Sequence, residues 1–270
     1  MFEERPKSIE IDGLSIAYRE AGKGAPLVLL HGWPMQSLEW RRQLQGLSDD
    51  YRVVAWDAPG AGQSSDPPET TRLDDWADWL AEFIQALDLG PCHLGGLSWG
   101  GGLALELYRR HPGLVRTLIL VSAYAGWAGS LPADEVDRRL QLMRRNSRRP
   151  VGEWAPELIS TLVAEDASPH LREELTVLLA GFHPAATRTA LEAFARADLR
   201  DVLGGVDVPA FLLCGEKDVR APGAVRQPLA SGIADSELVV VPGVGHMVHM
   251  EAPERCNSEI RRFLARHAAV

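Results

Sequence analysis

A serine between two glycines has the setting best suited to nucleophilic chemistry. Ser98 lies in Gly96-Leu97-Ser98-Trp99-Gly100, which matches the pattern G-x-S-x-G. The apolar run His93–Leu97 precedes this serine and a helical pattern, Trp99–Tyr108, follows it. A strand-to-helix turn of this kind exposes the serine Oγ above a sheet, and small residues are needed at its ends because backbone approaches backbone there. The setting predicts a nucleophilic serine.

A nucleophilic serine needs a base, and the base needs an acid that orients it. His246 follows the last apolar run of the chain in a glycine-rich loop and is the candidate base. Asp218 closes the segment Gly215-Glu216-Lys217-Asp218, which also follows an apolar run, and is the candidate acid. Loops that follow parallel strands share one edge of the sheet. The order Ser98, Asp218, His246 is typical of a triad in such a fold.

Two neighbouring residues are alternatives for the acid and the base. Glu216 lies two residues before Asp218, and its side chain is expected in solvent or in a surface pair. His249 lies three residues after His246 and is expected at a helix start, facing solvent or Glu251. Neither is the first choice for the triad.

Two backbone amides are candidates for an oxyanion hole, which needs N–H groups aimed at one point. The first is the amide of Trp99, directly after the nucleophile. The second is the amide of Trp33 in His31-Gly32-Trp33-Pro34, because Pro34 has no N–H to donate. Four aromatic residues are candidates for the lining of a substrate pocket: Trp33, Trp99, Tyr124 and Trp127.

Short apolar runs that alternate with helical patterns must position these residues. Two strands, Ser8–Ile11 and Ser15–Tyr18, flank the hairpin signal Asp12-Gly13. Runs that are apolar on both faces suit a parallel sheet covered by helices. These runs are Pro26–Leu30, Arg52–Trp56, His93–Leu97, Val115–Val121, Ala210–Leu213 and Leu238–Val241. Helices are expected at Leu38–Leu47, Leu73–Leu87, Trp99–Tyr108 and Glu254–His267. The alternation predicts an α/β fold with a mostly parallel, doubly wound sheet.

Residues 127–200 interrupt this alternation because they contain no convincing strand. Helical patterns cover Leu131–Met143, Val151–Ala164, Leu171–Leu179 and Thr187–Ala197. We therefore expect residues 1–126 and 201–270 to form the core and residues 127–200 to form a helical cap over the sheet.

Composition excludes several classes of protein. The chain has 270 residues and a net charge of −9, and no clustered excess of Lys and Arg suits nucleic acid. The basic stretch Arg144–Arg149 is interpreted as a solvated helix end. Cys92, Cys214 and Cys256 are far apart and support neither a disulfide framework nor a cysteine-rich metal site. No signal-peptide core occurs in Met1–Pro6 and no membrane span is found, so the cytoplasm is the expected location.

The motifs together resemble those of the α/β-hydrolase superfamily, in particular its small capped esterases, lactonases and haloperoxidase-like members. The resemblance rests on the segment from His31 to Trp40, on Asp57–Ser64, on the serine motif, and on the acid and histidine loops. It implies that Asp57 holds loop amides and that His31 is a hydrogen-bonding scaffold residue. His93, inside a strand, is expected to be a satisfied core histidine.

The resemblance implies a serine hydrolase that cleaves a carboxylic ester or lactone through an acyl-enzyme. The expected partner is a small-molecule substrate, with no cofactor, metal, nucleic acid or membrane, and the chain is expected to be a monomer or small homo-oligomer. The same triad would serve a carbon–carbon bond hydrolase or a cofactor-free perhydrolase. A hydrolase-like ligand receptor is the non-enzymatic alternative. Ser98 argues against dehalogenases and epoxide hydrolases, whose nucleophile is Asp.

Overall fold

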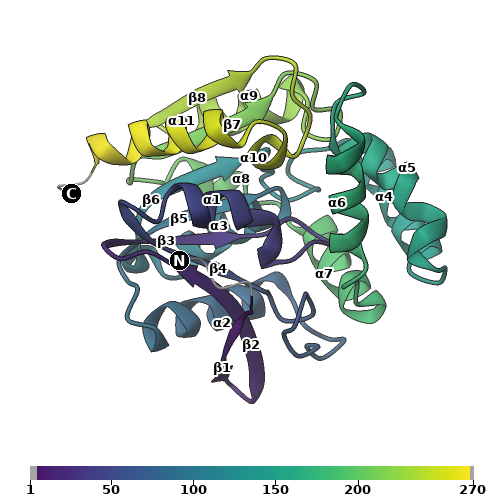
Figure 1. Ribbon diagram of the computed structural model, residues 1–270, viewed down its shortest axis with the longest axis horizontal. Coiled ribbons are helices and arrows are strands. Elements are labelled where there is room, and N and C mark those ends of the chain that lie inside the picture. Colours follow the sequence, from purple (N-terminus) through teal and green to yellow (C-terminus); the bar gives the residue numbers. More distant parts are fainter. Residues whose placement is uncertain (1–4, 268–270) are drawn as a thin grey trace.

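Eight strands form one sheet at the centre of the chain in the computed structural model, which describes residues 5–267 (Figure 1). The strands are β1 Lys7–Ile11, β2 Leu14–Ala21, β3 Ala25–Leu30, β4 Tyr51–Trp56, β5 Cys92–Leu97, β6 Val115–Val121, β7 Ala210–Gly215 and β8 Ser236–Val241. Each predicted strand is present. Residues 1–4, part of the segment in which no signal-peptide core is expected, lie outside the described residues.

The strand order is β1-β2-β4-β3-β5-β6-β7-β8. β2 pairs antiparallel with both β1 and β4, and all the other pairs are parallel. The antiparallel hairpin therefore lies at one edge of a parallel sheet, as its turn signal and the buried apolar runs predict. The parallel part places the chain segments after β3, β5, β6, β7 and β8 at one edge.

Alternate residues of the central strands pack into two separate cores, one on each face of the sheet. On β3, Val28 and Leu30 belong to one core, whereas Leu27 and Leu29 belong to the other. Five helices cover these two faces of the sheet: α1 Arg41–Gly46, α2 Leu73–Ala86, α3 Trp99–Arg110, α9 Gly223–Gly232 and α11 Pro253–Arg266. All of them except α9 coincide with a predicted helical pattern. Apolar side chains of α2, α3 and α9 fill the first core, and those of α1 and α11 fill the second.

One predicted helix differs from expectation, and three helices have no predicted range. The pattern at Leu38–Leu47 forms a 3₁₀ turn, η1 Ser37–Trp40, followed by the short α1, and not one continuous helix. Its first turn is held by long-range contacts of Ser37 and Glu39, described below. No helix was predicted at α8 Arg200–Leu203 or at α9, and for α10 Val248–Glu251 only a helix start at His249 was expected. A second 3₁₀ turn, η2, spans Pro112–Leu114.

The segment 127–200, for which a cap is expected, is helical and contains no strand. Its helices are α4 Ala133–Asn146, α5 Val151–Leu162, α6 Pro169–Leu179 and α7 Pro184–Arg196. They lie together at one side of the sheet, in teal and green on the right of Figure 1. The indole Nε1 of Trp33, after β3, donates to Thr187 Oγ1 of α7 at 2.9 Å. A Cβ built on Gly60, after β4, would lie 2.3 Å from Ala186 Cβ. α7 therefore packs at the edge where the parallel strands end.

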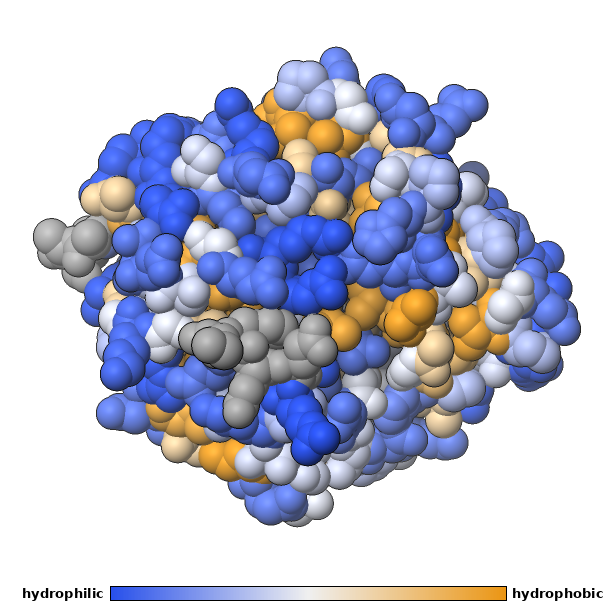
Figure 2. All heavy atoms as spheres, in the orientation of Figure 1, coloured by the Kyte–Doolittle hydropathy of each residue, from blue (hydrophilic) through white to orange (hydrophobic). Residues whose placement is uncertain are grey.

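The surface and the cysteines agree with the composition. In the face shown in Figure 2, hydrophilic residues predominate and apolar residues form small separate groups. Within residues 5–267 no helix is both long and apolar enough to cross a bilayer. Cys92, Cys214 and Cys256 are buried and free. The basic stretch lies at the end of α4 as interpreted, and Arg144, Arg145 and Arg149 pair with Glu192, Glu157 and Glu153.

Candidate active site

Ser98 stands on a sharp turn between β5 and α3. Its φ and ψ angles are +53° and −110°, a combination that side chains rarely adopt. Its N–H donates to Val121 O of β6 at 2.9 Å, which ties the turn to the neighbouring strand. A Cβ built on Gly96 would lie 2.3 Å from the Gly100 carbonyl carbon, and one on Gly100 would lie 2.5 Å from Leu30 O. Both glycines are therefore required by close backbone packing, as the motif predicts.

The structure brings the candidate acid and base together. His246 Nδ1 donates to Asp218 Oδ2 at 2.9 Å, and both side chains are buried. Asp218 Oδ1 accepts the backbone N–H groups of Arg220 and Ala221 at 2.8 and 2.9 Å. Burial alone raises the pKa of Asp218, but His246 and the two N–H groups outweigh it and hold the pKa below its ordinary value. The carboxylate is therefore ionised, and its hydrogen bond to Nδ1 leaves Nε2 of the imidazole unoccupied by Asp218.

The loops that carry these two residues lie in direct contact. A Cβ on Gly215 would meet Gly245 O at 2.0 Å, and Lys217 N–H donates to Val244 O at 2.8 Å. Ser98 follows β5, two strands from β7, at the same carboxyl edge of the sheet. Between residues 5 and 267 the structure contains no hydrogen bond that joins Ser98 Oγ to His246. The role of Ser98, Asp218 and His246 as a triad therefore stays a prediction that this arrangement supports.

Glu216 lies where the sequence places it, away from the imidazole. Its side chain is exposed, and its Oε2 accepts the backbone N–H of Gly243 at 2.9 Å. This hydrogen bond connects the acid loop to the loop that carries His246, on the solvent side of both.

His249 lies at a helix start as predicted, but the predicted surroundings of its side chain are wrong. The imidazole does not face solvent or Glu251 but is completely buried, with its ring 4.2 Å from that of Trp40. Burial lowers the pKa of His249 to about 3, so the ring is neutral at physiological pH. Glu251 turns instead to the backbone N–H groups of Ala164 and Gly245, at 2.8 and 2.9 Å. The helix at this point is only four residues long, and its inner side faces the core.

A buried carboxyl group beside His249, that of Glu39, was missed by the sequence analysis. Glu39 Oε1 lies 3.7 Å from His249 Nε2 and accepts the N–H of Gly32 at 3.0 Å. Burial raises the pKa of Glu39 well above its usual range. The signal in the sequence was the flanking pair Leu38 and Trp40, which places a charged residue within an apolar stretch.

The loop after β3 presents an amide of the kind that an oxyanion hole needs. His31 holds this loop: its Nδ1 donates to Gly32 O at 2.9 Å, and its Nε2 accepts the N–H of Ala58 at 3.0 Å. Within the described part of the chain, the N–H groups of Trp33 and Trp99 make no hydrogen bond. Both are therefore free to donate to a ligand, and their role in an oxyanion hole stays a prediction.

Asp57 holds loop amides and His93 is a hydrogen-bonded core histidine, as expected of them. Asp57 is buried and accepts the backbone N–H groups of Ser37 and Gln63 at 2.7 and 3.0 Å. His93 is buried within β5, and its Nδ1 lies 2.9 Å from Thr117 Oγ1 on β6. Neither residue belongs to the acid–base pair.

The four aromatic candidates for the pocket are all buried, in two groups. The rings of Trp33 and Trp99 are 4.7 Å apart, and Trp76 lies 5.8 Å from Trp99. Tyr124 and Trp127 lie 6.3 and 6.1 Å from the ring of Phe194 on α7. The Tyr124 ring is also 6.4 Å from that of His246. Tyr124 is thus next to the candidate base, and pocket lining by the four stays a prediction.

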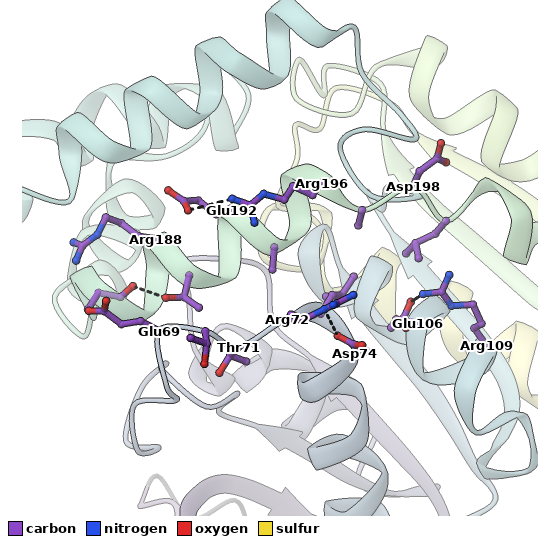
Figure 3. Close-up of a pocket in the computed structure, with 17 residues that line it drawn as sticks. Glu69, Thr71, Arg72, Asp74, Glu106, Arg109, Arg188, Glu192, Arg196 and Asp198 are labelled. Carbon is purple, nitrogen blue, oxygen red and sulfur yellow. Dashed lines mark hydrogen bonds and ion pairs between the residues drawn. The ribbon is translucent and has the colours of Figure 1, made fainter.

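A cavity of about 770 Å³ lies elsewhere (Figure 3). On one side it is lined by α7, and on the other by the start of α2 and the C-terminal end of α3. Charged side chains dominate its lining, among them Arg72, Glu106, Arg109, Arg188 and Glu192. None of Ser98, Asp218 and His246 lines it, so the cavity is not the candidate active site. Residues 5–267 also contain no group of three or more His, Cys, Asp or Glu side chains placed to hold a metal ion.

Known proteins resemble this chain along most of its length. The (E)-2-((N-methylformamido)methylene)succinate hydrolase of Acinetobacter baylyi is 29% identical over 253 residues, which cover 92% of this chain and 93% of that protein. The non-heme chloroperoxidase of Streptomyces lividans is 30% identical, with 94% and 97% of the two chains covered. A solved thermophilic esterase from Thermogutta terrifontis, with malate bound, is 29% identical and superposes with a TM-score of 0.89 over 97% and 99% of the chains.

The family model for the alpha/beta hydrolase fold matches residues 25–253. This range begins with β3 and ends after the histidine loop, so it contains the serine turn, the acid loop and the helical segment between them. The sheet order and the long similarity to known hydrolases agree with the match. The chain belongs to the α/β-hydrolase family.

Proposed function

We propose that the chain is a serine hydrolase that cleaves carboxylic esters or lactones through an acyl-enzyme. The hydrogen bond of 2.9 Å between His246 and the buried Asp218 is the observation that carries the proposal. It fixes the imidazole tautomer with the proton on Nδ1, so that Nε2 is the basic nitrogen. The turn at Ser98 raises a hydroxyl at the same edge of the sheet. This combination is suited to acyl transfer and not to attack by an aspartate on an sp³ carbon.

In the first half of the proposed reaction Ser98 Oγ attacks the substrate carbonyl carbon. His246 Nε2 takes the hydroxyl proton as the new C–O bond forms. The negative charge that develops on the carbonyl oxygen is bound by the free N–H groups of Trp33 and Trp99. Asp218 stabilises the imidazolium, which then gives its proton to the leaving alcohol as the ester bond breaks.

In the second half water attacks the acyl-enzyme. His246 Nε2 takes a proton from this water, and the second tetrahedral intermediate uses the same two N–H groups. Its collapse breaks the bond to Ser98 Oγ, which recovers its proton from His246. The products are a carboxylic acid and the regenerated enzyme, and a lactone yields the hydroxy acid in the same way.

The helical segment 127–200 is proposed to be the cap, and residues 1–126 and 201–270 the core. The contact between Trp33 and Thr187 supports this division, because it joins the loop of the proposed oxyanion hole to α7. The contacts of Trp33 with Thr187, and of Tyr124 and Trp127 with Phe194, support a pocket lined by Trp33, Trp99, Tyr124 and Trp127 beside α7. They would form the apolar wall against which the substrate rests.

The relatives support hydrolysis as the reaction. The protein of A. baylyi is named as a hydrolase of a succinate derivative, and the structure from T. terrifontis is an esterase. The experiment is turnover of p-nitrophenyl acetate and butyrate by the natural chain and by Ser98→Ala. We expect release of p-nitrophenol by the natural chain and a loss of several orders of magnitude in the variant. Equal rates for the two proteins would refute the proposal, and no turnover of any ester or lactone would favour a ligand receptor.

Perhydrolysis is the second candidate, and the chloroperoxidase of S. lividans among the relatives favours it. Hydrogen peroxide would replace water as the group that attacks the acyl-enzyme, and the product would be a peracid. Incubation with acetate, peroxide and bromide tests this by bromination of monochlorodimedone. Bromination that depends on Ser98 would establish the second activity, whereas its absence beside rapid ester hydrolysis would leave the esterase alone.

A further inference from the structure

Arg220 is a cation at the boundary between the acid loop and the helical cap segment. It lies two residues after Asp218, to which its backbone N–H donates at 2.8 Å. Its guanidinium Nη1 donates to Thr161 Oγ1 of α5 at 3.1 Å. The chain directly after α5 contacts the histidine loop, since a Cβ on Gly245 would lie 2.7 Å from Ala164 N. The guanidinium is thus held between α5 and the loops that carry the proposed acid and base.

Two hydrogen bonds hold the backbone carbonyl of Arg220. Its carbonyl oxygen accepts the Tyr124 hydroxyl at 2.6 Å and Arg139 Nη2 at 3.0 Å. The Tyr124 ring is in turn 6.4 Å from the His246 ring. Arg220 is therefore connected to both members of the acid–base pair, through Asp218 on one side and Tyr124 on the other.

The Arg220 guanidinium forms no direct ion pair within the described residues, although Asp218 and Glu135 act on its charge from a greater distance. The other cations nearby are paired: Arg139 lies 2.6 Å from Glu135, and Lys217 lies 3.1 Å from Asp166. In the part of the chain that the structure describes, no carboxylate lies within 4.0 Å of the Arg220 guanidinium, whose one hydrogen-bond partner there is the neutral Thr161.

Half-buried guanidinium groups of this kind favour an anionic partner. Burial lowers the pKa of Arg220, and the neighbouring Arg139 lowers it further, while Tyr124 and Asp218 act in the opposite direction. A desolvated cation is costly unless an anion and hydrogen-bond acceptors meet it. The guanidinium retains N–H donors that Thr161 does not use, and its planar fork matches the two oxygens of a carboxylate.

We propose that Arg220 binds a carboxylate group of the substrate, so that the preferred ester or lactone is an anionic one. The inference rests on the proposed hydrolysis at Ser98 and adds the class of substrate to it. Arg139 and Tyr124 position Arg220 through its carbonyl oxygen, and Thr161 positions the guanidinium. The carboxylate then lies beside the cap, and the scissile carbonyl lies toward the proposed triad.

Two matched pairs of esters test the proposal and distinguish the two places that the carboxylate can have. In the first pair it is on the acyl side: the p-nitrophenyl monoester of glutarate against p-nitrophenyl 5-methylhexanoate, in which an isopropyl group replaces the carboxylate. In the second pair it is on the leaving group: 4-acetoxybenzoate against phenyl acetate. The measured quantity is the ratio of kcat/KM for the charged ester to that for the neutral ester.

Arg220→Met removes the charge and keeps both backbone hydrogen-bonding groups of the residue. We expect this variant to lower the ratio for one of the two pairs by about 10- to 100-fold, the effect of one charge-assisted hydrogen bond. Arg220→Lys, which keeps the charge but lacks the fork, should restore part of the ratio. Arg148→Met, which changes an exposed arginine between α4 and α5, is the matched control and should leave both ratios as they are. Thermal unfolding of each variant checks that the fold is retained.

A ratio that Arg220→Met leaves within twofold in both pairs would overturn the carboxylate site. If the natural chain still hydrolyses the neutral esters and Ser98→Ala does not, the proposed esterase function survives that result. A natural chain that hydrolyses none of the four esters would overturn both proposals together.

Discussion

His246 Nδ1 lies 2.9 Å from Asp218 Oδ2, while the other oxygen of the same carboxylate accepts two backbone N–H groups of its own loop. The carboxylate cannot rotate without breaking these bonds, so its orientation toward the imidazole is built into the loop. This geometry distinguishes Asp218 from Glu216, whose carboxylate is exposed and binds the Gly243 N–H.

Asp218→Asn keeps the shape of the side chain but removes the charge that stabilises the imidazolium. The amide also favours the wrong imidazole tautomer, because its NH₂ group donates where the carboxylate accepts. We expect kcat on an activated ester to fall by up to roughly 10⁴-fold, the effect of the same change in a serine protease triad. Steady-state kinetics of the purified variant measure this.

Glu216→Gln is the matched control on the same loop. It leaves an acceptor for the Gly243 N–H, so kcat should decrease by much less than tenfold. If the large loss occurred at Glu216 and not at Asp218, the assignment of the acid would be wrong although the reaction class would stand.

Glu39 is expected to hold the loop that carries the Trp33 amide. Glu39→Ala leaves the buried N–H of Gly32 without an acceptor, which costs about 1–3 kcal/mol in the free energy of unfolding. The loosened loop should also lower kcat by roughly tenfold, with less effect on KM. Urea unfolding and ester kinetics measure the two effects.

Glu39→Gln provides the comparison, because its amide oxygen still accepts the Gly32 N–H. This variant should keep most of the stability and of kcat. An alanine variant as stable and as active as the natural chain would show that the loop does not depend on Glu39.

Phe182 is expected to influence which acyl chains are accepted. It follows α6, and its ring lies 5.0 Å from that of Trp154 on α5. Phe182→Ala should change the preference between butyrate and acetate esters by about 10-fold or more, since each methylene in an apolar pocket changes selectivity by roughly 10- to 200-fold. Val177→Ala, at a 66% exposed position of α6, is the control. An equal loss on every ester by a folded Phe182→Ala would contradict a role in selectivity.

His93 makes stability depend on pH. Burial lowers its pKa in the folded chain to about 4, from 6.5 in the unfolded chain. Between these values the unfolded chain binds one more proton at this site, so the contribution to stability decreases as the pH falls from about 6.5 to about 4. The slope for one such proton is about 1.4 kcal/mol per pH unit.

His93→Asn isolates this contribution, because asparagine offers an N–H to Thr117 but does not titrate. The free energy of unfolding, measured by urea titration at pH 7, 6 and 5, should decrease less steeply with falling pH in the variant. The two slopes should differ by the amount that corresponds to about one bound proton. The difference between the slopes of the two proteins is the informative quantity. Glu39, whose pKa is shifted in the opposite direction, contributes to the pH dependence of both proteins equally. Identical slopes would show that His93 is not the group responsible.

Much of the fold follows from local sequence. All eight strands were predictable because apolar runs of strand length are separated by helical patterns, and the hairpin was predictable from Asp12-Gly13. α9 was missed because it begins with Gly223 and contains Pro228, and both residues disfavour a helix interior. Its apolar residues Val225 and Leu229 complete the core, and tertiary packing outweighs the local preference.

The candidate site was predictable only in part. The residues after the strands indicated Ser98, Asp218 and His246, and the structure joins the last two by a hydrogen bond. The sequence misplaced His249 because a histidine at a helix start is more often exposed, whereas this one is enclosed by Trp40 and Glu39. Contacts between residues about 210 positions apart are not readable from local patterns.

Covalent labelling of Ser98 tests the central claim most directly. Diethyl p-nitrophenyl phosphate reacts with an activated serine, and the phosphoryl group remains on its Oγ while p-nitrophenol leaves. The account predicts one equivalent of p-nitrophenol, complete loss of esterase activity, and a diethylphosphoryl group mapped by peptide mass spectrometry to Ser98. Ser98→Ala should release none. Labelling of another residue, or ester hydrolysis that persists after full modification of Ser98, would contradict the account.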